Sequence, residues 1–150
     1  MDASYDFEAL KRLRDKWSRR LIVKGLSRAD DVKRCAEIGV DAVILSNHGG
    51  RQLDSASSAL ATLQEVATSV DIPVFVDGGV QRGSDVLKSL CLGANMVGLG
   101  RVLLYALAAE GEAGVQHCLS LLKSEIDRDQ AMLGAPDLTT LTPDLIWQRP

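Results

Sequence analysis

The chain has 150 residues, of which 46% are hydrophobic and 25% charged, and its formal net charge is −3 at pH 7. These values are typical of a single globular domain. The 17 basic residues are scattered along the chain, which argues against a nucleic-acid-binding surface. The sequence shows no signal-peptide pattern and no apolar stretch near the roughly 20 residues that cross a bilayer. We therefore expect a cytoplasmic protein with no membrane segment and no nucleic-acid partner.

The spacing of apolar residues and the helix-capping patterns divide the chain into alternating strands and helices. A leading amphipathic helix covers residues 6–17. Ser27 with Asp30 three residues later is typical of a helix start, and Ser84 can cap a later helix. The expected strands cover residues 21–23, 41–46, 74–76 and 95–100, and the helices that follow them cover residues 27–39, 58–69, 84–93, 102–109 and 113–133.

Four alternations of strand and helix predict an α/β fold of (βα)4 type, with parallel strands and outer helices. We expect one domain over residues 1–150, composed of a leading helix (1–19), four βα units (20–110), a final helix (111–134) and a polar surface tail (135–150). The three cysteines fall at apolar positions of expected helices and lack metal-binding spacing. We therefore expect them to pack in the core, and we expect no metal site: Cys35, Cys91 and Cys118.

Polar residues or glycines follow each expected strand at its carboxyl end. Lys24 and Gly25 follow the first strand, and the sequence SNHGGR at residues 46–51 follows the second. The third strand runs into DGG at residues 77–79, and the fourth into GLGR at residues 98–101. Because ligands of parallel α/β folds bind at the carboxyl ends of the strands, we expect these four segments to meet at one rim.

Three of these segments favour an anionic or hydroxylated ligand. The GLGR segment opens into a helix whose N–H groups can hold a phosphate, with a bidentate contact from Arg101; the alternative is a tight turn that needs glycine. Asp77 can bind sugar hydroxyls or cap the next loop. Lys24, at the end of an apolar strand, is costly to bury unless it is paired or faces an anion.

His48 and Arg51 are the strongest candidates for chemistry. A histidine can accept a proton near neutral pH, and a planar guanidinium nearby can hold a carboxylate. The other histidine, His117, lies on the expected final helix, where we expect an ordinary surface or boundary residue.

Four segments, LIVKGL, VILSNHGGRQLD, VFVDGGVQRGSDVLKSL and GANMVGLGRVLLYALAAEGEAGV, resemble the carboxyl-terminal half of the FMN-dependent α-hydroxy acid oxidases and dehydrogenases. The resemblance implies half of a TIM (βα)8 barrel and FMN as the cofactor. The implied reaction is oxidation of an (S)-2-hydroxy acid, of the lactate, mandelate or glycolate type, to the 2-oxo acid. The implied electron acceptor is oxygen, a quinone or another molecule.

The resemblance also implies roles for individual residues. His48 is the implied acceptor of either the α-proton or the hydroxyl proton and so also contacts the substrate, and Arg51 is the implied binding residue for the substrate carboxylate. Gln81 replaces the first of two arginines that are usual in the family, so it offers hydrogen bonds without charge. The implied flavin contacts are Lys24 at the N1/O2 locus, Ser46, and, around the ribityl and phosphate end, Asp77, Gly78, Gly79, Gln81, Gly100 and Arg101.

Length is the larger departure from the family. A TIM barrel takes about 250 residues, and the resemblance implies that four strands, with the aspartate that orients the histidine, lie outside this sequence. A half-barrel has two unpaired edges and an open apolar face. We expect an amino-terminal half-barrel or self-association to cover that face. The alternative function is a non-catalytic half-barrel that binds flavin or phosphate and needs a complementing chain.

Overall fold

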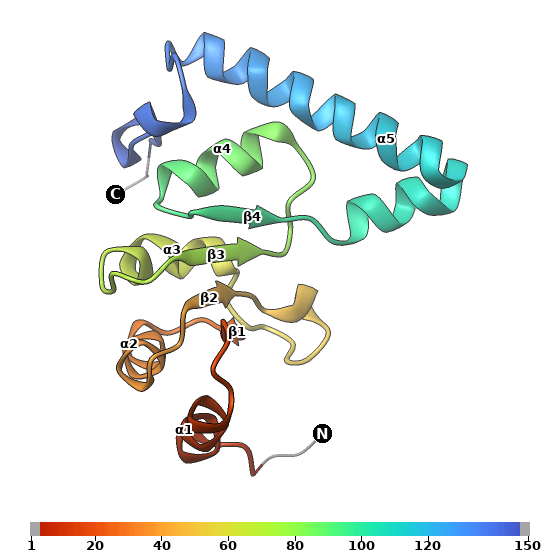
Figure 1. Cartoon of the computed structure of the whole chain (residues 1–150). Helices are drawn as coiled ribbons and strands as arrows, with labels where there is room; N and C mark the ends of the chain where they lie inside the picture. The colour runs from red at the N-terminus through yellow and green to blue at the C-terminus, as the bar shows by residue number, and fades with distance from the viewer. Residues whose placement is uncertain (1–3, 148–150) are drawn as a thin grey trace.

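The computed structural model describes residues 4–147 and contains one four-stranded parallel sheet. The strands lie side by side in chain order, and helices flank the sheet (Figure 1). The expected fold class, a (βα)4 half of a TIM barrel, is confirmed. The strands are β1 (Ile22–Leu26), β2 (Ala42–Leu45), β3 (Val74–Asp77) and β4 (Met96–Gly98).

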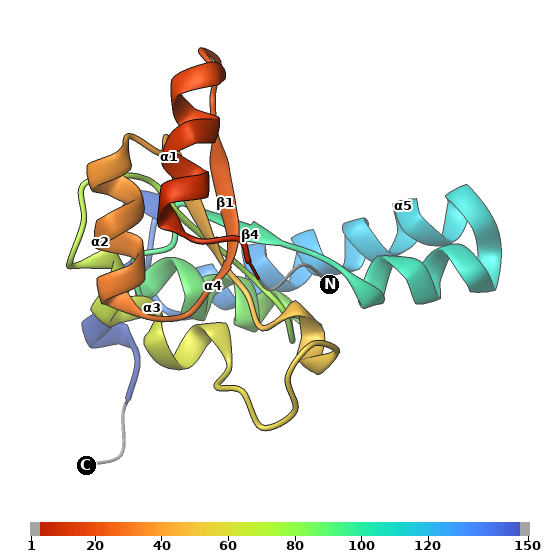
Figure 2. The same cartoon turned by 90° about the horizontal axis from the view of Figure 1, so that it is seen from below.

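The helices are α1 (Phe7–Lys16), α2 (Ala29–Ile38), α3 (Ala59–Ala67), α4 (Gly83–Cys91) and α5 (Arg101–Met132). The separate helices expected at 102–109 and 113–133 are the two arms of α5. The helix breaks at Glu110 and Gly111, where Gly111 has φ 61° and the backbone leaves helical geometry. Figure 2 shows the two arms meeting at an apex away from the sheet, and the second arm returns to pack on α4.

The first strand runs further than the expected residues 21–23. It extends to Leu26, and its register with β2 shifts between Lys24 and Leu26. Gly25 lies at that irregularity with φ 96°, a conformation that suits glycine because it has no Cβ. The apolar pattern does not reveal this extension, because a lysine and a glycine interrupt it.

Two helix starts also differ from expectation. Helix α2 begins after Arg28 rather than Ser27, and no side chain caps it. Helix α4 begins after Arg82 rather than at Ser84. The reason is Asp85, whose carboxylate accepts the Arg82 backbone N–H at 3.0 Å and so fixes the start of the helix before Ser84 is reached.

The side chains of the two central strands alternate between the faces of the sheet. On one face, Val43, Leu45, Val74 and Val76 are almost fully buried. They pack with residues of the helices that cover this face, among them Val32, Cys35, Ala59, Leu63 and Val66. This helix-facing layer is the hydrophobic core of the chain.

The opposite face is open. Ile44, Phe75 and Met96 are direct cross-strand neighbours, so they share this face, and Ile22 lies on it two residues before Lys24. Met96 is 57% exposed and Ile22 is 46% exposed. We call these four residues the inner face, because a closed barrel would turn them toward the opposite strands.

Two of the three cysteines, Cys35 and Cys91, are buried as expected for core residues, whereas Cys118 is not part of the buried core. Cys35 and Cys91 are buried free thiols and Cys118 is half-buried. Burial raises the pKa of both Cys35 and Cys91, which makes their thiols less reactive. In residues 4–147, no group of three or more His, Cys, Asp or Glu side chains is placed to hold a metal ion.

The tail after α5 follows the surface in part. It contains two short 3-10 turns, and Ile146 packs against the core. The expected tail runs to residue 150, and its residues 148–150 lie outside the described part of the chain. Of the helices in residues 4–147, none is both long and apolar enough to cross a membrane.

Candidate active site

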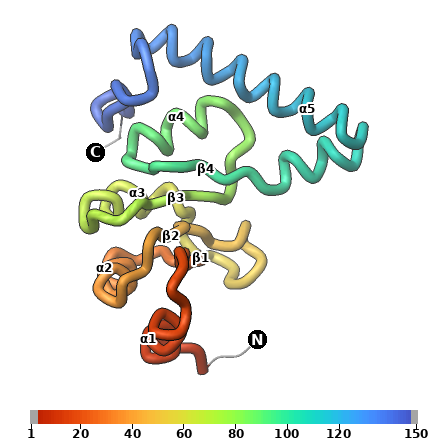
Figure 3. The backbone as a smooth tube through the Cα atoms, in the orientation of Figure 1, coloured from red at the N-terminus to blue at the C-terminus, as the bar shows by residue number. Residues whose placement is uncertain are grey.

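The carboxyl ends of the four strands meet around one cleft. The loop after β2, the turn after β3 and the start of α5 all leave the sheet on the same side (Figure 3). The cleft has a volume of about 790 Å³, within the roughly 300–1,000 Å³ of small-molecule sites. Its lining includes every residue that the sequence analysis assigns to flavin or substrate: Lys24, Ser46, His48, Arg51, Asp77, Gly78, Gly79, Gln81, Gly100 and Arg101.

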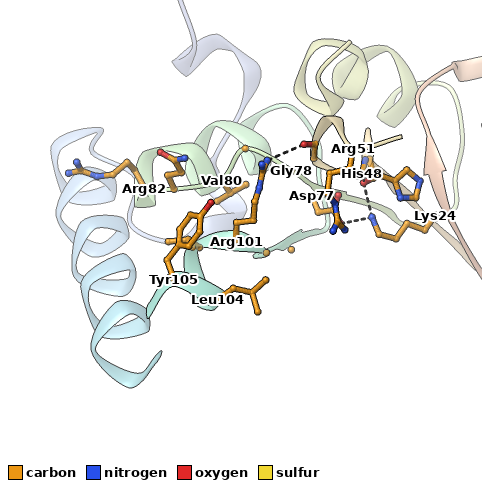
Figure 4. Close-up of a pocket in the computed structure, with 17 residues that line it drawn as sticks. Lys24, His48, Arg51, Asp77, Gly78, Val80, Arg82, Arg101, Leu104 and Tyr105 are labelled. Atoms are coloured by element: carbon orange, nitrogen blue, oxygen red, sulfur yellow. Dashed lines mark hydrogen bonds and ion pairs between the residues drawn. The ribbon is translucent and has the colours of Figure 1, made fainter. Parts of the chain in front are cut away.

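Lys24 is held by polar groups from two other strand ends. Its Nζ donates to Ser46 Oγ at 2.7 Å and to Asp77 Oδ2 at 2.6 Å (Figure 4). The ion pair is partly exposed, with 41% of the lysine side chain and 27% of the aspartate side chain accessible. The pair therefore contributes little to stability, but it fixes a positive charge at the edge of the cleft.

His48 lies in a tight turn two residues after Ser46. Its φ is 55°, which is rare for a residue with a side chain. Ser46, itself buried, accepts the His48 backbone N–H at 3.1 Å through the same Oγ that accepts from Lys24. A Cβ placed on Gly25 would lie 2.5 Å from His48 Nε2. The imidazole thus rests against the backbone of β1, and only a glycine at position 25 leaves room for it.

The loop that carries His48 continues into Arg51 through two glycines of positive φ, Gly49 and Gly50. Asn47 Oδ1 accepts the Gly49 N–H at 3.0 Å, which closes the turn. Within residues 4–147, the Arg51 guanidinium has no ion-pair partner, and no side chain bonds the His48 ring. Both groups are therefore placed to act on a ligand.

The far end of the cleft is built from backbone groups and one arginine. Gly78 and Gly79 turn the chain after β3 with φ 94° and 77°. Helix α5 begins at Arg101 after Gly100, and a Cβ on Gly79 or Gly100 would meet open space. The N–H groups of the first helical turn and the Arg101 guanidinium are suited to bind an anion such as a phosphate.

Gln81 and Arg82 do not supply a second cation to this end. Arg82 forms an ion pair of 2.7 Å with Glu125 of α5, and it lies on the side of the cleft far from Lys24 and His48 (Figure 4). The hydrogen bond from the Gly83 backbone N–H lowers the pKa of Glu125 most, and the hydrogen bond from the Arg82 side chain lowers it further. The hydrogen bond and charge of Glu125 raise the pKa of Arg82. Arg82 thus joins α4 to α5.

Three residues that shape the cleft were not predicted from the sequence. Gly25 makes room for His48, Asn47 closes the histidine turn, and Glu125 engages Arg82. The glycine beside a strand-end lysine and the asparagine before the histidine are visible signals in the sequence. Glu125 gives no such signal, because it lies 42 residues from the Gly83 N–H that it accepts.

Sequence comparisons identify related proteins. The family model of the FMN-dependent dehydrogenases matches residues 1–148. The (S)-mandelate dehydrogenase of Pseudomonas putida is 53% identical over 146 residues, which are 97% of this chain and 37% of that protein. The L-lactate dehydrogenase (cytochrome) of Saccharomyces cerevisiae is 42% identical over 153 residues, which are 97% of this chain and 26% of that protein. The chain thus spans well under half of either relative.

Solved structures agree with the sequence comparisons. The crystal structure of the monotopic membrane protein (S)-mandelate dehydrogenase superposes with a TM-score of 0.96 at 52% identity, over 99% of this chain and 40% of the other. Flavocytochrome b2 carrying the L230A mutation, with benzoylformate, superposes with a TM-score of 0.90 at 42% identity, over 96% of this chain and 38% of the other. From the family model and these relatives together, we conclude that the chain belongs to the FMN-dependent dehydrogenase family.

Proposed function

We propose that the chain carries the flavin-binding and proton-accepting half of an enzyme that oxidises an (S)-2-hydroxy acid to the 2-oxo acid. One observation carries the proposal. His48, Arg51 and Lys24 reach a single cleft that also contains the amino-terminal end of α5. A proton acceptor, two cations and a phosphate-binding helix end are the groups that a flavin and a carboxylate substrate require.

The residues present fit FMN. The turn of Gly78 and Gly79, the start of α5 and Arg101 suit the phosphate and ribityl end. Lys24 is fixed by Ser46 and Asp77, so its charge can stabilise negative charge on the flavin ring. The Ser46 hydroxyl can donate its O–H to the flavin, because its oxygen already accepts hydrogen bonds from Lys24 Nζ and the His48 backbone N–H. Gln81 leaves the phosphate end with one arginine.

The substrate half of the proposal rests on His48 and Arg51. FMN, when bound, supplies a two-electron acceptor. Arg51 holds the substrate carboxylate, which orients the hydroxyl-bearing carbon toward the flavin. His48 takes up a proton that the hydroxy acid releases on oxidation. The imidazole is suited to this because its ring rests on Gly25 and bonds no other side chain in residues 4–147.

The names of the relatives favour a small 2-hydroxy acid as substrate. The related proteins include an (S)-mandelate dehydrogenase, an L-lactate dehydrogenase and a peroxisomal (S)-2-hydroxyacid oxidase of Arabidopsis thaliana. All three names fit a substrate with a carboxylate for Arg51 and an α-hydroxyl group for His48. We therefore propose the class of (S)-2-hydroxy acids.

The open inner face supports a partner that completes the barrel. Ile22 and Met96 lie exposed there, and β1 and β4 are the edge strands of the sheet. Apolar residues on an uncovered sheet face and unpaired strand edges favour association. We propose an amino-terminal half-barrel as the partner, with self-association as the alternative. A cytoplasmic location stays a prediction that cell fractionation can test.

Flavin spectroscopy tests the proposal. Purified chain is loaded with FMN, made anaerobic and mixed with lactate, mandelate or glycolate. We expect a bound flavin spectrum, which the substrate bleaches once self-association or an added amino-terminal half-barrel covers the inner face. His48→Ala should keep the flavin and lose the bleaching, whereas His117→Ala, at the exposed histidine of α5, should behave as the unmodified chain. Bound flavin that no hydroxy acid bleaches favours the non-catalytic half-barrel. A chain that binds no FMN contradicts the proposal.

A further inference from the structure

Arg101 contacts the histidine loop as well as the proposed phosphate end of the cleft. It is the first residue of α5, and its Nη2 donates to the carbonyl oxygen of Gly49 at 3.2 Å (Figure 4). The two residues are 52 positions apart in the sequence, so the bond joins separate parts of the rim. Gly49 lies between His48 and Arg51, the two residues proposed to act on the substrate.

The fit between Arg101 and Gly49 is close. A Cβ on Gly49 would lie 3.1 Å from Nη2 and 3.4 Å from Cζ of Arg101, and the φ of Gly49 is 68°. Asn47 Oδ1 accepts the N–H of the same glycine at 3.0 Å. The central residue of the loop is therefore held at its N–H by Asn47 and at its carbonyl by Arg101.

Among the residues at this end of the cleft, Arg101 is the cation that can bind a phosphate while it also holds the Gly49 carbonyl. Gln81 carries no charge, and Arg82 is engaged by Glu125. A guanidinium has five N–H donors in a planar fork, so Nη2 can hold the Gly49 carbonyl while the remaining donors bind a phosphate. A lysine ammonium is a compact point charge and lacks that fork.

We propose that Arg101 is a positioning residue that ties the phosphate end of the cleft to the histidine loop. An anion bound by Arg101 immobilises the guanidinium. Because the guanidinium also holds the Gly49 carbonyl, the mobility of the loop that carries His48 and Arg51 falls as well. The phosphate part of this inference rests on the proposed function. The tie to Gly49 is independent of it and can be tested without any ligand.

Limited trypsin digestion of the full chain measures the order of the loop, because Arg51 lies directly after the two glycines. Arg101→Met deletes the donor. In phosphate-free buffer, we expect trypsin to cleave this variant after Arg51 about fivefold faster than the unmodified chain. The loss of one hydrogen bond from a charged donor makes the open, cleavable form of the loop more populated. Cleavage after Lys88 in α4 serves as the internal reference. Arg12→Met, at an exposed residue of α1, should leave the Arg51 rate unchanged.

Arg101→Lys separates anion binding from positioning. NMR titration with inorganic phosphate should show binding to the unmodified chain and, within about tenfold in affinity, to Arg101→Lys, which keeps the charge. At saturation, phosphate should slow cleavage after Arg51 in the unmodified chain but not in Arg101→Lys. Equal slowing in both would overturn the dual role of the guanidinium.

The remaining outcomes separate this inference from the proposed function. Identical cleavage after Arg51 in the unmodified chain and Arg101→Met, without ligand, would refute the tie itself. Phosphate that binds and leaves the cleavage rate unchanged would refute the coupling and leave the flavin proposal standing. A chain that binds neither phosphate nor FMN would refute the phosphate site, while the comparison without ligand still decides the tie.

Discussion

The two faces of the sheet differ in how completely this chain covers them. On the helix-facing side, Val43, Leu45 and Val74 are at most 2% exposed. On the inner face, whose residues alternate with these along the strands, Ile22 and Met96 are about half exposed. The chain therefore builds a buried core on one side and leaves apolar residues of the other side exposed. Mutations on the two faces can test the two sides separately.

The candidate site lies where these two faces end, at the carboxyl rim. Its side chains are held by polar contacts rather than by the core, as Lys24 with Asp77 and Arg101 with Gly49 illustrate. Stability thus depends mainly on the buried core and the geometry of the site mainly on polar contacts. Four substitutions test this division, from the largest expected effect to the smallest, and one of them, Gly25→Ala, lies where the two meet.

Leu63→Ala should have the largest effect on stability. Leu63 is fully buried between α3 and the sheet, and its truncation should cost about 3 kcal/mol of unfolding free energy through lost burial and a residual cavity. Met96→Ala, on the inner face, should cost about 0.5 kcal/mol or less. Urea denaturation of both variants measures the difference. Similar losses would mean that the inner face is covered in the isolated chain.

Gly25→Ala should disturb both stability and the site. The new Cβ would meet His48 Nε2 and would force a side chain into a φ of 96°, which together cost about 2 kcal/mol. Gly134→Ala is the matched control, because Gly134 also has a positive φ and its Cβ would meet open space. Urea denaturation gives the cost, and the NMR signal of the His48 ring reports displacement. Equal effects of the two variants on stability and on the His48 signal would refute the proposed contact between Gly25 and His48.

Asp77→Asn should change flavin binding more than stability. The ion pair with Lys24 is partly exposed, so its loss should cost about 0.5 kcal/mol of unfolding free energy. Without the carboxylate, Lys24 is less well fixed, and we expect FMN affinity to fall about fivefold. Fluorescence quenching of FMN measures this. If affinity rises instead, Asp77 opposes the anionic cofactor more than it orients the lysine.

Glu125→Gln should give the smallest effect, and that effect should depend on pH. The folded-state pKa of Glu125 is lowered by the Gly83 N–H and by Arg82, so the carboxylate stabilises the fold above its unfolded-state pKa. This contribution is lost as the pH falls through the lower folded-state pKa. Thermal melts should show a lower Tm for the variant at pH 7 and converging Tm values in acid. A difference that persists in acid would assign the effect to packing.

Much of this molecule follows from short patterns in the sequence. The alternation of apolar strands and amphipathic helices predicts the parallel sheet, and the residues after each strand predict one rim, because parallel strands place their carboxyl ends together. The bulge at Gly25 and the start of α4 were not predictable from local patterns. A glycine is needed at position 25 because the His48 ring, which comes from another loop, lies against it. Helix α4 starts before Ser84 because the Asp85 carboxylate accepts two backbone N–H groups, those of Gln81 and Arg82.

Interactions across the rim were also beyond local patterns. Lys24 reaches an aspartate 53 residues away, and Arg101 reaches a glycine 52 residues away. Each residue type indicates charge or flexibility in isolation, but its partner depends on the register of the sheet. The resemblance to a family predicts that these residues contact a flavin, while the contacts among them emerge only from the folded chain.

A chimeric barrel tests the central claim most directly, namely that this rim carries flavin-dependent hydroxy acid chemistry once the inner face is covered. The chain replaces the matching region of the Pseudomonas putida (S)-mandelate dehydrogenase, to which it is 53% identical over 146 residues. Anaerobic (S)-mandelate should bleach the bound flavin of the chimera, and the same chimera with His48→Ala should keep its flavin unbleached. A folded, flavin-loaded chimera that (S)-mandelate leaves yellow, while it bleaches the parent enzyme, would contradict the account.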